Sequence, residues 1–89
     1  MEIKTEDLVE VHDDGHWDWE WYADYLYFHI PSRRYFNDVQ SGCSCDGYND
    51  PGGYSLDSFE TWSREEALRH TRGDANRALR DFKESEYIK

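Results

Sequence analysis

The chain has few cysteines, few prolines and few basic residues. Its 89 residues include two cysteines, two prolines and 10 Lys+Arg against 20 Asp+Glu, which gives a formal net charge of −10. No apolar run approaches the roughly 20 residues of a membrane-spanning helix, and the first residues lack the basic-then-apolar order of a secretory signal. We therefore expect a single soluble, cytoplasmic domain over residues 1–89, without a membrane partner.

The two cysteines, Cys43 and Cys45, stand one residue apart. A disulfide across so short a loop would add little stability, because it removes almost no entropy from the unfolded chain. Two thiolates at this spacing are able to face one metal ion, and His12 and His16 have the His-x-x-x-His spacing of zinc fingers. The four residues together predict a structural zinc site. The alternative is that the cysteines are small residues at a tight turn and the histidines lie at the surface. No other cofactor is expected.

Negative charge is concentrated in the first two thirds of the chain. Residues 1–62 hold 14 acids and 3 bases, a net charge of −11, whereas residues 63–89 hold 6 acids and 7 bases, a net charge of +1. A surface of this sign repels phosphate backbones, which disfavours direct binding of nucleic acid. The same field attracts a basic surface, including the basic cleft of a nucleic-acid-binding protein.

Three tryptophans mark the clearest expected strand. Trp17, Trp19 and Trp21 alternate with Asp18, Glu20 and Tyr22, and this period of two puts the three indoles on one face of a strand that begins near residue 16. The segment 2–14 has a weaker pattern, which fits either a short strand or one helical turn.

Further strands are expected after the tryptophans. Ala23-Asp24 predicts a turn, residues 25–30 alternate as a second strand, and residues 34–39 form a third short strand. We therefore expect a small antiparallel sheet of two or three strands over residues 16–39. Alternate positions cannot all point into one core, so some of the Trp and Tyr rings must meet solvent.

The C-terminal part predicts a loop and then a helix. Residues 40–62 have the composition of an acidic, Gly- and Cys-containing loop. A capping box at 63–66 begins a helical pattern in the segment 63–85, and apolar residues at steps of three and four predict one helix over about 64–84. A break at Arg72-Gly73, with Asp74 capping a second helix, is the alternative. The fold class is therefore α+β, with the sheet packed by one C-terminal helix.

Catalytic patterns are not evident. Cys43 or Cys45 paired with His29 or His70 shares no motif that fixes the geometry of a nucleophile and a base. A chain of this length also has little volume for a substrate pocket. We expect a protein that is not an enzyme.

A motif in the middle of the chain has a counterpart in a known group of proteins. The stretch from Arg34 to Asp46 contains an aromatic strand and Ser-Gly-Cys-Ser-Cys, and a Pro-containing acidic loop leads to Ser55-Leu56-Asp57-Ser58-Phe59. It resembles small uncharacterised proteins of actinobacterial phages over about the middle third of the chain. The chain departs from that group in its Gly-rich loop, where an aromatic usually follows the proline, and in its charged C-terminal segment. The resemblance implies a phage source, and hence the cytoplasm of an infected bacterial host, but no activity.

Charge, aromatic content and this resemblance together predict an acidic protein that binds and inhibits a host protein. The favoured target is a nucleic-acid-handling or defence complex, since DNA-mimic inhibitors present carboxylates where phosphates would sit, and this chain is similar to them in charge. Alternatives are a zinc-stabilised structural or adaptor domain built on the Cys-x-Cys loop, and a component of the phage particle. The oligomeric state is not predicted. The residues expected to contact the partner are Asp13, Asp14, Asp18, Glu20, Asp24, Tyr25 and Tyr27.

Overall fold

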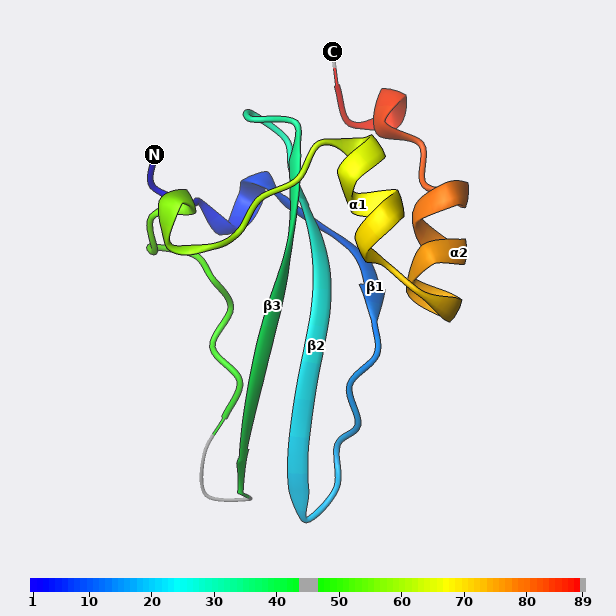
Figure 1. The fold of residues 1–89 in the computed structure, drawn as a ribbon. Coiled ribbons are helices and arrows are strands. Elements are labelled where there is room, and N and C mark those ends of the chain that lie inside the picture. The colour runs from blue at the N-terminus through cyan, green and yellow to red at the C-terminus, as the bar shows by residue number, and fades with distance from the viewer. Residues whose placement is uncertain (44–46, 89) are drawn as a thin grey trace.

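A computed structural model describes residues 1–43 and 47–88 of the chain. The described residues form a three-stranded antiparallel sheet in the order β1-β2-β3 and two helices on one of its faces (Figure 1). This arrangement confirms the α+β class. The elements are β1 (Leu8–Asp13), β2 (Glu20–His29), β3 (Arg34–Cys43), α1 (Arg64–His70) and α2 (Gly73–Asp81), with short 3-10 turns at Thr5–Asp7, Leu56–Ser58 and Glu84–Glu86. None of the helices in the described ranges has the length and apolar character needed to cross a membrane.

The β2–β3 hairpin is the longest feature of the sheet. Its register runs without interruption from His29 opposite Arg34, beside the turn, to Glu20 opposite Cys43. Arg33 in the turn has φ of +56°. β1 pairs only with the half of β2 nearest this turn, from His29 to Tyr25, so the other half of the hairpin extends past it.

Both faces of the sheet are covered near the β2–β3 turn. Side chains alternate along each strand, so neighbours in sequence enter different cores. On the helix side, Leu26, Phe28 and Tyr35 pack with residues of α1 and α2. On the opposite side, Tyr27 and Phe36 pack with residues of the N-terminal segment and of the chain after β3.

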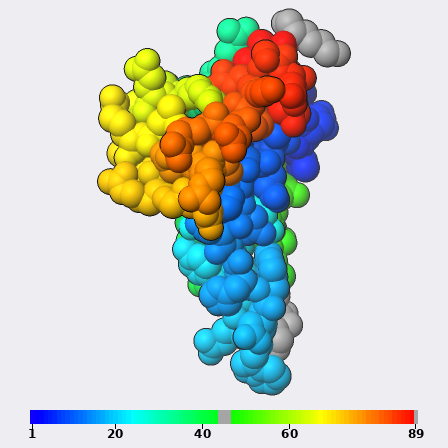
Figure 2. Space-filling view, turned by 90° about the vertical axis from the view of Figure 1, so that its right-hand side faces the viewer, coloured from blue at the N-terminus to red at the C-terminus, as the bar shows by residue number. Residues whose placement is uncertain are grey.

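The sheet continues beyond the helices as a narrow arm, which we define as residues 13–24 and 37–43. The helices lie over the end of the sheet nearest the β2–β3 turn, and the arm projects away from them (Figures 1 and 2). The molecule is elongated, with extents of 39 × 30 × 21 Å. Val39, on the helix side of the arm, is 53% exposed.

Two predictions about the strands are wrong. Trp17 and Trp19 lie in the β1–β2 connection, and β2 begins only at Glu20. The turn predicted at Ala23-Asp24 is absent, because both residues pair in register with β3, opposite Gln40 and Val39. For the same reason β3 continues to Cys43, four residues into the segment that was expected to be a loop. The weak pattern before residue 14 is a strand, β1, which was one of its two interpretations.

The single predicted C-terminal helix is in fact two helices. Thr71 and Arg72 are extended, with ψ of 154° and 157°, and Gly73 has φ of +57°. The break is therefore at the position of the alternative interpretation. Asp74 does not cap α2, however, because the N-cap is Arg72 and makes no side-chain capping bond. The corner is fixed instead by Asn76, whose Nδ2 donates to the Leu68 carbonyl at 2.9 Å.

The start of α1 matches the prediction. Ser63 is the N-cap, and its Oγ accepts a hydrogen bond from the Glu66 N–H at 3.3 Å. The Glu66 carboxylate accepts one from the Ser63 N–H at 3.1 Å, which completes the capping box and holds the pKa of Glu66 below its usual value.

Candidate functional site

The free end of the arm carries two exposed tryptophans. Trp19 is 78% exposed and Trp17 is 54% exposed. Asp18 shapes this tip, because its Oδ1 accepts a hydrogen bond from the Trp19 N–H at 2.8 Å. Trp17 stacks on Trp21 at 5.5 Å, whereas Trp19 makes no ring contact within the described residues. Trp19 therefore offers its indole to solvent.

Trp21 fixes the tip to the sheet. It is buried, and its Nε1 donates to the Cys43 carbonyl at 2.9 Å. It lies flat against Gly42, where a Cβ would approach the indole Cζ2 to 2.8 Å. Glycine is thus required at this position by the close approach of the ring. The arm is a packed structure rather than a loose loop.

The arm carries negative charge without positive charge. Its residues include six acids and no Lys or Arg. Of the carboxylates predicted to contact a partner, Asp13, Asp14, Asp18 and Glu20 are exposed and Asp24 is half-buried. Among the described residues, the ion pairs made by arginine are Arg34–Glu66 and Arg77–Asp74, both outside the arm.

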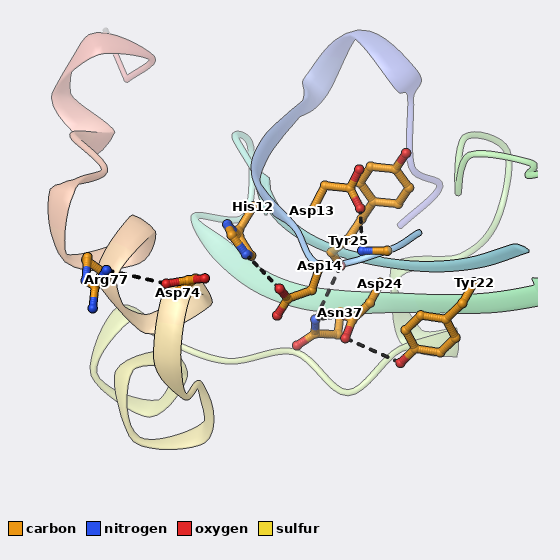
Figure 3. Close-up of polar contacts among 10 residues, drawn as sticks. His12, Asp13, Asp14, Tyr22, Asp24, Tyr25, Asn37, Asp74 and Arg77 are labelled. Atoms are coloured by element: carbon orange, nitrogen blue, oxygen red, sulfur yellow. Dashed lines mark hydrogen bonds and ion pairs between the residues drawn. The ribbon is translucent and has the colours of Figure 1, made fainter. Parts of the chain in front are cut away.

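The carboxylates at the base of the arm have local partners (Figure 3). Asp14 lies 3.2 Å from His12 Nε2, and Asp13 accepts a hydrogen bond from the Gly15 N–H at 2.8 Å. Asp24 accepts one from Asn37 Nδ2 at 2.9 Å and a longer one from the Tyr22 hydroxyl. Burial and the nearby Asp24 and Asp14 raise the pKa of Tyr22. These bonds orient the carboxylates but leave their charge unneutralised by Lys or Arg.

Of the two tyrosines predicted to contact a partner, one is accessible. Tyr25 is partly exposed and stacks on Tyr27 at 5.6 Å. Tyr27 is only 7% exposed, because the N-terminal segment and the chain after β3 cover its face of the sheet. The prediction of Tyr27 as a surface residue is therefore corrected.

Tyr48 was not singled out in the sequence, yet it fastens the chain after β3 to the arm. Its hydroxyl donates to Asp38 Oδ2 at 2.7 Å and lies 2.7 Å from the Tyr27 hydroxyl. Its ring packs on Tyr25 at 4.8 Å. Burial and the bonds to Tyr27 and Asp38 raise the pKa of Tyr48. An isolated tyrosine in a Gly- and Asp-rich stretch has no local signal for this role.

Of the predicted zinc ligands in the described residues, His16 and Cys43 line one cavity, whereas His12 lies far from Cys43. His12 is opposite Leu26 and Cys43 is opposite Glu20, which are six residues apart on β2, or about 20 Å at 3.3 Å per residue. The prediction of one site that holds both His12 and Cys43 is therefore wrong. No group of three metal-ligating side chains is found within the described ranges. Cys45 lies outside the described residues, and thiolate ligation involving it stays a prediction.

One of the two histidines considered for catalysis, His29, is also distant from Cys43. His29 is nine residues from Glu20 along β2, so it lies about 30 Å from Cys43. It is buried, its Nδ1 lies 2.7 Å from the Ser32 Oγ, and burial lowers its pKa. His70, at the end of α1, stacks on Trp62 with the ring centroids 4.9 Å apart.

Among the cavities lined by described residues, two border the arm. The larger, about 380 Å³, is open to solvent and has the size to admit a side chain of a partner. It is lined by His16, Glu20, Trp21, Tyr22, Ser41, Gly42 and Cys43. The smaller, about 220 Å³, lies where the arm meets the α1–α2 corner, and its lining includes Asp14, Asp24 and Arg72.

Comparison with known proteins gives no relative. Protein-family models do not match the chain, and neither the curated proteins nor the solved structures contain a match.

Proposed function

We propose that the protein is a binding domain whose arm docks on the basic surface of another protein and blocks a nucleic-acid-binding site there. The observation that carries this proposal is the composition of the arm: exposed Trp17 and Trp19 stand among six acids, with no Lys or Arg. Aromatic side chains are typical anchors of protein interfaces, and charge selects and steers the partner.

Trp19 supplies the affinity in this proposal. A tryptophan buries at least 150 Å² when it is fully enclosed, which at about 25 cal/mol per Å² is about 4 kcal/mol before the costs of association. The tip needs little ordering on binding, because Asp18 holds the turn and Trp21 is bonded to Cys43.

The acids supply the choice of partner. A nucleic-acid-binding cleft presents Lys and Arg for phosphates, and carboxylates on a rigid arm meet the same groups. The resemblance to phage proteins favours a host protein of this class, in nucleic-acid handling or defence, with inhibition by occupation of its cleft.

The proposal is tested by capture of partners from bacterial lysate and measurement of their affinity at low and high salt. The arm variant is Asp18→Asn with Glu20→Gln. The matched control is Glu65→Gln with Asp81→Asn, which removes the same charge from exposed positions on α1 and α2. Two lost charge pairs at about 0.7 kcal/mol each predict a tenfold weaker complex for the arm variant at low salt, and no change for the control. Equal weakening by both variants would show that only net charge matters and would contradict docking by the arm.

A second variant separates the anchor from the charge. Trp19→Ala removes an exposed indole, so we expect an unchanged melting temperature and a complex about 30-fold weaker, as for an interface hot spot of about 2 kcal/mol. Nucleic acid should compete with the wild-type chain for the captured partner. Undiminished affinity of Trp19→Ala, or binding that nucleic acid leaves untouched, refutes the corresponding part of the proposal.

A further inference from the structure

The outer edge of β3 has peptide groups that point away from the sheet. Tyr35 exchanges both of its backbone hydrogen bonds with Trp62, at 2.8 Å each, so its peptide groups do not face β2. Peptide groups alternate along a strand, so those of Asn37, Val39 and Ser41 also point outward. The partner strand agrees, because Tyr22, which is opposite Ser41, exchanges its backbone bonds with His16 on its other side.

From Asn37 to Ser41 the outward peptide groups of this edge have no backbone partner within the described residues. The chain after β3 is joined to the arm through side chains: Gln40 Nε2 donates to the Asn49 carbonyl at 2.7 Å, and Tyr48 donates to Asp38. Gln40 and Asp38 lie on the face opposite the helices, whereas Val39 and Ser41 are exposed on the helix side. Three N–H and three C=O groups are thus left for another strand.

The two edges of the sheet differ in protection. Proteins usually blunt an exposed edge with Lys, Pro or a bulge, or cover it. β1 has a bulge between Glu10 and His12, and α2 packs beside it (Figure 1). The β3 edge from Asn37 to Ser41 has no Lys, no Pro and no bulge, and the chain after β3 is bonded to the Gln40 and Asp38 side chains rather than paired with this edge through backbone bonds. An unprotected edge is a template for strand addition.

We propose that this edge binds an extended segment of the partner that carries Arg or Lys at alternate positions. The inference rests on the proposed function and names the form of its partner. A second copy of this chain is disfavoured, because each copy has a net charge of −10. An added strand would place alternate side chains beside Val39 and Ser41, and Ser41 borders the open cavity that contains Glu20 and Tyr22. A basic side chain there meets a carboxylate and an aromatic ring, while backbone bonds hold the strand.

The test uses a synthetic hexapeptide of alternating Val and Arg with blocked ends, and the same peptide N-methylated at its four central residues. Methylation keeps the charge and removes N–H donors. We expect at least tenfold weaker binding of the methylated peptide, and at least tenfold slower amide hydrogen exchange at Val39 and Ser41 when the unmethylated peptide is bound. Equal affinity of the two peptides, or unchanged exchange at these amides, overturns strand addition.

A protein variant gives an independent readout. Val39→Pro removes an outward N–H and blocks the edge, whereas Val39→Thr keeps both the donor and a β-branched side chain. We expect the proline variant to bind the two peptides equally weakly and the threonine variant to behave as the wild type. If Val39→Pro does not fold, the peptide pair still decides. If the peptide does not add as a strand but Asp18→Asn/Glu20→Gln still weakens binding of the captured partner, strand addition is refuted and the proposed function stands. If the peptide adds as a strand but the arm variant has no effect on the captured partner, the proposed function is refuted and strand addition at the β3 edge stands.

Discussion

Removal of the Tyr48 hydroxyl tests how the chain after β3 is held on the arm. Tyr48 has one hydroxyl proton and donates it to Asp38, so Tyr27 must donate to Tyr48. Tyr48→Phe removes both bonds at once. Asp38 is 5% exposed and keeps Gln40 as a partner, while the buried Tyr27 hydroxyl loses its bond. A bond to a charged group at about 2 kcal/mol and a neutral one at about 1 kcal/mol predict a loss of about 3 kcal/mol in the free energy of unfolding.

The matched control is Tyr27→Phe, which removes only the donor to Tyr48. Its expected cost is about 1 kcal/mol, and the double variant should cost about the same as Tyr48→Phe alone, because the second hydroxyl then has no bond left to lose. Urea denaturation followed by tryptophan fluorescence measures all three values. Equal costs of the two single variants, or a double variant whose cost is their sum, would refute the hydroxyl chain.

Three other perturbations have expected outcomes. Burial raises the pKa of Tyr27 to about 12 and also raises the pKa values of Tyr35 and Tyr48. Tyrosines of the unfolded chain lose their protons near pH 10, so the stabilisation is complete below pH 10 and falls as the pH rises toward 12, by up to about 1.4 kcal/mol per pH unit for each tyrosine. Denaturation midpoints that stay constant from pH 9 to 12 would contradict this expectation. Gly73→Ala should lower the free energy of unfolding by about 1 kcal/mol, or the melting temperature by 4–8 °C, because φ at this residue is +57°. No neighbour contacts the new Cβ, so backbone strain is the whole expected cost, and Gly73→Asn should cost less. An unchanged melting temperature for the alanine variant would contradict the strain. Ser63→Ala should cost about 1 kcal/mol in urea denaturation through loss of the α1 cap, with Ser63→Thr near the wild type; equal costs would count against the cap.

Local patterns in the sequence predicted those parts of the fold that depend on neighbouring residues. The capping box at Ser63 is complete within four residues, so the start of α1 was correct. The start of β2 does not depend on neighbouring residues alone. Alternation at Trp17 and Trp19 fits the connection at the end of a hairpin as well as a strand, and pairing with β3 decides between the two. The apolar residues keep their helical spacing across Gly73, which is why one helix was predicted. Glycine was the only local signal for the turn between α1 and α2.

The candidate site was predictable in charge and unpredictable in geometry. The excess of acids over bases located the negative surface, and the tip carboxylates Asp18 and Glu20 are exposed. Which face of the sheet is covered depends on distant segments, so Tyr27 was placed wrongly and Tyr48 was missed. The register of the three strands separates His12 from Cys43, and spacing along the chain carries no information about that register.

The most direct test of docking by the arm is hydrogen exchange of the chain alone and in complex with the captured partner. Docking by the tip and the β3 edge predicts slower exchange at residues 17–22 and 37–43, with α1 and α2 unchanged. Slower exchange confined to α1 and α2, with the arm unaffected, would contradict the proposed binding surface.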